Sequence, residues 1–406
     1  MKKIFVQFGS GLGSMSRVFP IVKLLKERGH IIRYSGYPEA KKYMNILQIE
    51  ELDTNFCFND KKVRNPKSNW KSAEEFWEMM GYNDWEWIEK KVEQLSKSII
   101  SFAPDLIISD LGFLCWISAK VLRIPLVTIT QSCYHPERKY SSFRWWEESS
   151  ELKDNCQLMK WINKFLNKNG LDSINTFEEI FTGNLTLLPS YKEIDWLNGK
   201  NQYNTHFVGP ILFDDEAVWE ELVCSKAKYT VFCYTGRFYD NVGRSGENIF
   251  INTLEAMKNM DVNLVISVGG SKEMELAQNL LKQIKNLNFD NLRIVEFLPM
   301  KQVYKISDLV IHHGGHGSCL GQIGYEIPSI IIPTHSEREY NARVFQWLGF
   351  SEVISTEELS AEILHQKVCK MLADLSYRER LSKFHDTVKQ KNNLGVTYAV
   401  ELIERL

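Results

Sequence analysis

Residues 309–342 read LVIHHGGHGSCLGQIGYEIPSIIIPTHSEREYNA, and they are the most informative part of the chain for its fold. An apolar run at 309–312 predicts a buried β-strand, and two histidines and two glycines follow it through 315. A helix is expected to begin directly after the glycines, and a second apolar run at 329–333 predicts another strand. Strand, glycine turn, helix and strand in this order predict a parallel α/β sheet.

The start of the expected helix is suited to bind a phosphate. Free backbone N–H groups point out of a helix start, and the helix dipole favours a negative charge there. Ligands of open α/β sheets also bind at the carboxyl ends of the strands, where this turn lies. The predicted diphosphate site comprises His312, His313, Gly314, Gly315, His316, Gly317 and Ser318.

The same α/β rhythm extends on both sides of this stretch. In the second half of the chain, strands are expected at 229–234, 262–268 and 292–297. In the first half, strands are expected at 4–8, 31–34, 105–110, 125–130 and 185–189. The chain therefore predicts an α/β protein with two consecutive doubly wound halves.

The motif HHGGHGS, followed by EIP, IIIP and EREYNA, resembles the donor-binding signature of family-one glycosyltransferases of the GT-B fold. HFVGPILF at 206–213 looks like the interdomain linker of that family, and RGHIIRYSG at 28–36 resembles the end of its first helix and its second strand. The resemblance implies two Rossmann-like domains that face a central cleft. It places an acceptor-binding domain at 1–205, a linker at 206–216, a nucleotide-sugar domain at 217–385 and a terminal helix at 386–406 that packs back on the first domain.

The resemblance also assigns roles to residues of the second half. A histidine at the place of His313 contacts the donor diphosphate in the family, and His312 is a second candidate. The other residues assigned to the donor site are Gly236, Arg237, Leu298, Pro299, Glu337 and Arg338. The family often has Asp-Gln where Glu337 and Arg338 stand; Arg338 either favours an anionic sugar or pairs with Glu337, and we favour the pair.

The first glycine turn departs most from the family pattern. Gly13 is followed by Ser14 at the place where the family has the His or Asp that removes the acceptor proton. A serine hydroxyl is no base near neutral pH without another base beside it. Asp110 resembles the aspartate that orients the family's histidine. Three explanations stay open: Asp110 acts as the base, directly or through water, the acceptor is already acidic, or the protein is catalytically impaired.

Two aromatic segments flank the first half's strands. A long helix expected at about 72–102 carries Trp77 and Trp85, and the segment 134–165 carries Trp145 and Trp146. These tryptophans either pack in the core or form the wall of an apolar acceptor pocket together with Gly13 and Ser14.

Composition excludes several function classes. The formal net charge is −2, so nothing favours nucleic acid or an anionic membrane as a partner. No apolar run approaches the roughly 20 residues of a membrane span. The eight cysteines lack metal-ligand spacing, so we expect free thiols in a bacterial cytoplasm and no metal site.

The sequence thus predicts a metal-independent, inverting hexosyltransferase. It would need no cofactor and would move a hexose from a UDP- or dTDP-sugar to a hydroxyl of a small apolar or aromatic acceptor. Catalysis is assigned to Asp110, Ser14 and His313. The alternatives are a catalytically silent partner of another transferase, an epimerase acting on UDP-N-acetylglucosamine, and a transferase with a lipid acceptor. The oligomeric state is not predicted.

Overall fold

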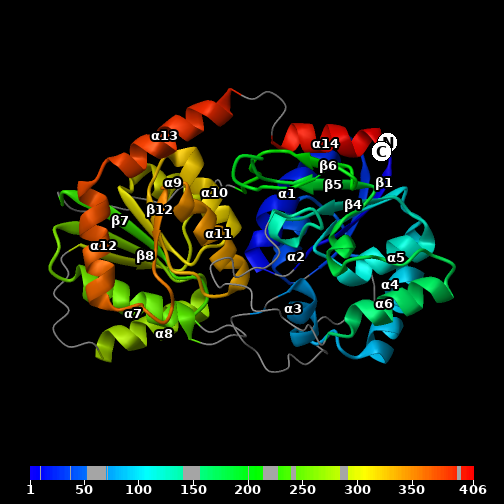
Figure 1. The fold of residues 1–406 in the computed structure, drawn as a ribbon, viewed down its shortest axis with the longest axis horizontal. Coiled ribbons are helices and arrows are strands. Elements are labelled where there is room, and N and C mark those ends of the chain that lie inside the picture. Colours follow the sequence, from blue (N-terminus) through cyan, green and yellow to red (C-terminus); the bar gives the residue numbers. More distant parts are fainter. Residues whose placement is uncertain are drawn as a thin grey trace.

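Two parallel β-sheets lie side by side, and helices cover their faces (Figure 1). The structure, a computed structural model, describes residues 1–9, 11–36, 38–52, 70, 72–139, 156–199, 201–213, 227–238, 244–283, 291–390 and 395–406. The fold class that the sequence predicted, α/β with two Rossmann-like halves, is confirmed.

The first sheet has six strands in the order β2-β1-β3-β4-β5-β6. Its strands are β1 Lys3–Gln7, β2 Ile31–Ser35, β3 Leu106–Asp110, β4 Leu126–Ile129, β5 Leu185–Leu188 and β6 Thr205–Phe207. All pair in parallel; Val6 of the first strand lies between Tyr34 and Ile108. Parallel sheets are covered on both faces, which explains why successive residues of β1 are apolar and fully buried.

The second sheet repeats this plan with the order β12-β11-β10-β7-β8-β9. Its strands are β7 Tyr229–Tyr234, β8 Val262–Ser267, β9 Leu292–Val295, β10 Leu309–His312, β11 Ser329–Ile331 and β12 Ser351–Val353. The strand β10, which ends at His312, lies in the middle of this sheet next to β7. The glycine turns after these two strands therefore meet at one edge.

The helices connect the strands in chain order. In the first half they are α1 Gly11–Glu27, α2 Pro38–Ile46, α3 Ala73–Met79, α4 Trp85–Phe102, α5 Phe113–Leu122 and α6 Leu158–Lys168, with short 3₁₀ turns η2 Ser132–Tyr134 and η3 Phe177–Phe181. In the second half they are α7 Ser245–Met257, α8 Ser271–Gln283, α9 Met300–Ile306, α10 His316–Tyr325, α11 Ser336–Trp347, α12 Ala361–Ala373 and α13 Ser376–Lys389. The last helix is α14 Val396–Arg405.

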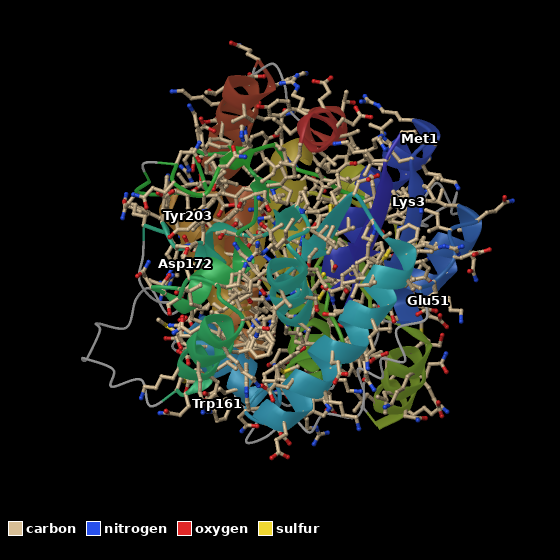
Figure 2. All side chains as sticks on the ribbon, turned by 90° about the vertical axis from the view of Figure 1, so that its right-hand side faces the viewer. Met1, Lys3, Glu51, Trp161, Asp172 and Tyr203 are labelled. Atoms are coloured by element: carbon tan, nitrogen blue, oxygen red, sulfur yellow. The ribbon has the colours of Figure 1, made fainter. Side chains whose placement is uncertain are left out.

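The long helix expected at 72–102 is two helices, α3 and α4. Asp84 starts the second one, because its carboxylate accepts a hydrogen bond from the backbone N–H of Trp87, 3.1 Å away. Figure 2 shows this half from its outer side, with Met1 and Lys3 far from Trp161 of α6 on the same face. The break turns the two tryptophans of the segment, Trp77 and Trp85, toward different neighbours.

The chain end also differs from the single helix expected at 386–406. It comprises the end of α13 and the separate α14. Figure 1 shows α13 over the second half and α14 on the first half, beside α1 and near both termini. The first two residues of the expected linker at 206–216, His206 and Phe207, belong to β6 and pair with β5.

Candidate active site

A cavity of about 1010 Å³ lies between the two halves, and residues of both halves line it. From the second half come the glycine turns after β7 and β10 and the start of α10. From the first half come the turn after β1, the end of β3 and the aromatic side chains of α3. The cavity therefore sits at the carboxyl ends of both sheets, where ligands of such sheets bind.

His313 is held on the donor side of this cavity by two glycines. A Cβ atom built on Gly236 would lie 2.5 Å from His313 Cδ2, and one built on Gly315 would lie 2.6 Å from His313 Cε1. Gly236 also has φ +71°, a conformation that side chains rarely adopt. Any side chain at either position would displace the imidazole, so both glycines are needed for its place.

The protonation state of His313 follows from its surroundings. Burial, and then the charge of Arg338, lower the pKa of His313 well below its usual value, so the ring is neutral at pH 7. Its Nδ1 accepts a hydrogen bond from the backbone N–H of Gly315 over 3.0 Å. The proton of the neutral ring is then on Nε2, which makes His313 a hydrogen-bond donor to a ligand.

The neighbouring histidine does not take part in the cavity, contrary to the prediction from sequence. His312 is fully buried, and its Nδ1 accepts the backbone N–H of Gly314 over 3.1 Å. Burial lowers the pKa of His312 to about 4. Adjacent residues of a strand point to opposite faces, so only one of the two histidines can face the ligand. Gly314 does not line the cavity either; its carbonyl accepts a hydrogen bond from Asn341.

The start of α10 forms the floor of the donor side. Gly315 is the residue before the helix, and Gly315, His316, Gly317 and Ser318 all line the cavity. α10 has ten residues, so its first free amides and its dipole both face this space. The arrangement suits a phosphate group, as the sequence predicted.

His316 links the donor side to the first half. Its Nε2 lies 3.6 Å from Oδ2 of Asp195, which follows β5. Oδ1 of this buried carboxylate accepts a hydrogen bond from the hydroxyl of Ser132. Burial would raise the pKa of Asp195, but His316 and the hydroxyls of Ser132 and Ser190 lower it below its usual value. No sequence pattern indicates this contact, because its two residues lie 121 positions apart in the chain.

The remaining residues predicted for the donor site line the cavity, but within the described residues the expected ion pair between Glu337 and Arg338 does not form. Arg237, Leu298, Pro299, Glu337 and Arg338 all line the cavity. Glu337 accepts a hydrogen bond from Asn341 over 3.3 Å, and Arg338 donates to the hydroxyl of Thr334.

Sequence reasoning missed several residues on the donor side: Tyr234, Ser267, Gly269, Lys272 and Glu273. A sequence pattern pointed to four of them, Ser267, Gly269, Lys272 and Glu273. The glycine pair at 269–270 between β8 and α8 repeats the strand–glycine–helix order seen at 309–318. The ring of Tyr234 lies 5.1 Å from that of His313, which no sequence pattern shows.

On the acceptor side, the partner of Asp110 is Arg17 rather than Ser14. Nε and Nη2 of Arg17 donate to Oδ1 of Asp110 over 3.1 and 2.8 Å, and Asp110 is fully buried. Oδ2 of Asp110 has no hydrogen-bond partner among the described residues. Ser14 lines the cavity, but its Oγ accepts the backbone N–H of Gly9 over 2.8 Å and thus holds the turn after β1.

The charge of Arg17 is firmly maintained. Burial would lower the pKa of Arg17, but Asp110 and, more weakly, Glu337 and Tyr134 raise it above its usual value. Glu337 belongs to the second half, so this interaction places Arg17 where the two halves meet. The sequence alone assigned no role to Arg17.

Only one of the tryptophans predicted to bind the acceptor can be placed in the cavity. Trp77 lines it, along with Trp70, Phe76 and Tyr82. Trp85 does not, because it packs against Trp161 and Phe165 of α6 with ring centroids 6.1 and 5.6 Å away. Trp145 and Trp146 lie outside the described residues. Gly13 lines the cavity as predicted.

One cluster of metal-ligand types occurs away from the cavity in the described part of the chain. Ligand atoms of Glu74, Glu78 and Cys156 lie within 4.8 Å of one another. The two carboxylates accept backbone N–H groups at the start of α6, from 157 to 159. The cluster is thus explained as a helix cap. None of the helices that the structure describes has the length and hydropathy to cross a bilayer.

Comparison with known proteins agrees with this geometry. Residues 248–393 match the sequence model of one family, the glycosyltransferase family 28 C-terminal domain. That span contains β8 to β12 and the whole glycine turn at the start of α10.

Curated relatives are similar in part or over the whole chain. UDP-glycosyltransferase 2 of Phaeomoniella chlamydospora is 24% identical over 44% of this chain and 39% of its own length. The UDP-N-acetylglucosamine–N-acetylmuramyl-(pentapeptide) pyrophosphoryl-undecaprenol N-acetylglucosamine transferase of Thermoanaerobacter sp. (strain X514) is 31% identical over 40% of this chain and 45% of its own length. The chain thus spans less than half the length of these two relatives. NDP-glycosyltransferase YjiC of Bacillus subtilis (strain 168) is 22% identical over 93% of this chain and 91% of its own.

Solved structures share the whole fold. The calicheamicin glycosyltransferase CalG4 has a TM-score of 0.72 at 17% identity, covering 100% of this chain and 98% of that one. The spinosyn rhamnosyltransferase SpnG complexed with thymidine diphosphate has a TM-score of 0.71 at 15% identity, covering 100% of both chains.

The two facing sheets and the phosphate-type helix start define a protein of the GT-B class. More particularly, residues 248–393 are similar to the glycosyltransferase family 28 C-terminal domain, and the whole chain shares the fold of the calicheamicin glycosyltransferase CalG4, in keeping with the resemblance seen at 309–342.

Proposed function

We propose that this chain is an inverting glycosyltransferase that moves a hexose from a UDP- or dTDP-sugar to a hydroxyl of a small apolar or aromatic acceptor. The observation that carries the proposal is His313, a neutral Nε2–H donor fixed between Gly236 and Gly315 beside the start of α10. We assign donor binding to 217–385 and acceptor binding to 1–205.

On the donor side, the amides at 315–318, the Ser318 hydroxyl and His313 would bind the diphosphate. These groups are oriented before the reaction, so they stabilise the negative charge that develops on the leaving diphosphate. We propose that this electrostatic stabilisation makes a metal ion unnecessary. Arg237 and Arg338, which line the same side, add positive charge.

On the acceptor side, Asp110 is the proposed base. The acceptor's hydroxyl proton passes to Oδ2 of Asp110, while its oxygen bonds to the anomeric carbon of the sugar. The bond between that carbon and the β-phosphate oxygen breaks, and its electron pair leaves with the diphosphate. Because the acceptor and the leaving group lie on opposite sides of the sugar, the configuration inverts.

The experiment has two steps. Thermal shift with UDP, dTDP and GDP identifies the nucleotide, and hydrolysis and transfer assays with the matching sugars follow, with and without EDTA. We expect stabilisation by UDP or dTDP, EDTA-resistant turnover, and a product of inverted configuration by NMR. Asp110→Asn should lower turnover about 100-fold or more, the usual range for a general base. Near-normal turnover of Asp110→Asn would show that another group is the base.

The same assays separate the alternatives. An epimerase would exchange solvent deuterium at the second carbon of UDP-N-acetylglucosamine without any acceptor. A silent partner would bind nucleotide without turnover, and a lipid-acceptor enzyme would sediment with membranes. We expect the protein to act in a reducing cytoplasm, and the free thiols of the six cysteines in the described part of the chain support this expectation.

A further inference from the structure

Arg17 takes the hydrogen bonds of the aspartate that orients the base in the family, while Ser14 stands at the place of the base itself. The resemblance implies that the aspartate at the end of this strand orients the residue that takes the acceptor proton. In the structure the residue bonded to Asp110 is Arg17, through both Nε and Nη2. A guanidinium is always protonated in proteins, so Arg17 cannot accept a proton and must do something else there.

The third nitrogen of Arg17 faces the cavity. In the described part of the chain, Nη1 donates no hydrogen bond, whereas Nε and Nη2 are both used by Asp110. The side chain lines the cavity, and Nη1 lies 3.8 Å from a Cβ built on Gly13, another lining residue. An acceptor oxygen that enters from the apolar side thus meets an N–H donor of fixed charge.

Three groups face this guanidinium: Asp110 from β3, Glu337 from the start of α11 and Tyr134 from η2. Two of them are carboxylates, so a permanently anionic acceptor would bring a third negative charge to one cation. A neutral hydroxyl that becomes anionic only during the reaction fits better. Arg17 would stabilise its oxygen as the proton leaves for Oδ2 of Asp110.

We propose that Arg17 is a second catalytic residue, whose Nη1 contacts the acceptor oxygen, and that it restricts the acceptor to acidic hydroxyls such as phenols and enols. This inference rests on the proposed function and names its acceptor class.

The chemistry of a carboxylate base supports the restriction. An ordinary aspartate has a pKa of about 4 and a phenol one of about 10, while the pKa of an alkyl alcohol is far higher, near that of water. Proton transfer to a carboxylate is thus unfavourable by roughly six powers of ten for a phenol and by many more for an alcohol. A hydrogen bond from a cation to the oxygen offsets part of the unfavourable proton transfer from a phenol, but it cannot offset the larger one from an alcohol.

The wall of the acceptor side agrees with this class. The rings of Trp77 and Phe76 contact each other at a tilt with centroids 4.7 Å apart, and the ring of Trp77 lies 5.7 Å from that of Tyr82. All three line the cavity. A flat aromatic acceptor would be bound by these rings and would carry the acidic hydroxyl that Arg17 needs.

The decisive experiment compares matched acceptors with the wild-type full chain. Phenol, 4-nitrophenol and 4-ethylphenol are assayed beside cyclohexanol and 4-ethylcyclohexanol, with the nucleotide sugar that the thermal-shift screen identifies. We expect kcat/KM for phenol and for 4-ethylphenol to exceed that of the corresponding cyclohexanol by about 100-fold or more. Equal values for phenols and cyclohexanols, or no transfer to any phenol, would overturn the inference. If wild-type protein bound neither UDP nor dTDP, the proposed function itself would be wrong.

A variant tests the residue directly. Arg17→His replaces the fixed cation by a group that can accept a proton beside Asp110, so the ratio of phenol to cyclohexanol turnover should fall at least tenfold. Arg28→His is the matched control, because Arg28 pairs with Glu404 outside the cavity, and its ratio should equal that of the wild type. An unchanged ratio in folded Arg17→His protein would overturn the role of Arg17; if this variant does not fold, the wild-type acceptor series decides.

Discussion

Replacement of Gly236 by alanine tests the donor site most sharply. The new Cβ would lie 2.5 Å from His313 Cδ2, far inside contact distance, so the imidazole must move. The hydrogen bond from His313 to the diphosphate would then be lost. A hydrogen bond to a charged group contributes about 1.5–3 kcal/mol. The expected loss in UDP or dTDP affinity is thus about 10- to 100-fold.

Gly349→Ala provides the matched control for this change. Gly349 has φ +70°, against +71° for Gly236, and its built Cβ would lie 2.6 Å from Arg380 Nε. Both variants carry the same backbone strain, about 1–2 kcal/mol, and both should melt a few degrees lower. Only Gly236→Ala should weaken nucleotide binding by isothermal titration calorimetry. Wild-type affinity in Gly236→Ala, or an equal loss in both, would refute the assignment of His313.

Three further outcomes follow from the site and its surroundings. Burial lowers the pKa of His312 from 6.5 to about 4, so at pH 5 the unfolded chain binds a proton that the folded chain does not. The free energy of unfolding should therefore fall by about 2 kcal/mol from pH 7 to pH 5. Urea unfolding of the wild type and of His312→Asn at both pH values checks this. Trp77→Ala should raise the acceptor KM while Trp85→Ala leaves it unchanged, since only Trp77 lines the cavity; steady-state kinetics with both variants would contradict this if the two behaved alike. Asp195→Asn should lower unfolding free energy by about 1–3 kcal/mol, because His316 loses its charged partner across the two halves; an unchanged melting curve would count against that contact.

The donor side could be predicted from sequence because its geometry is local. One strand, one turn and one helix start supply His313, Gly315 and Ser318 within a few residues. Even the inclusion of His312 could have been avoided, since side-chain direction alternates along a strand.

The acceptor side depends on contacts between distant parts of the chain. Arg17 and Asp110 are 93 residues apart, and no spacing rule connects them. Trp77 and Trp85 looked equivalent in one long helix, and the new helix start at Asp84 separated their surroundings. The absence of a general base at Ser14 could be seen in the sequence, but the contact between Arg17 and Asp110 could not.

The return of the last helix to the first half has a practical consequence for chimaeric enzymes. α14 packs against α1, and Glu404 accepts hydrogen bonds from Arg28 and lies 2.9 Å from the ring of His30. A graft that exchanges donor modules at one junction would carry a foreign α14 onto the resident acceptor module. Recombination therefore needs two crossover points, one after Phe207 and one between Lys389 and Val396, so that α14 keeps its parental partner.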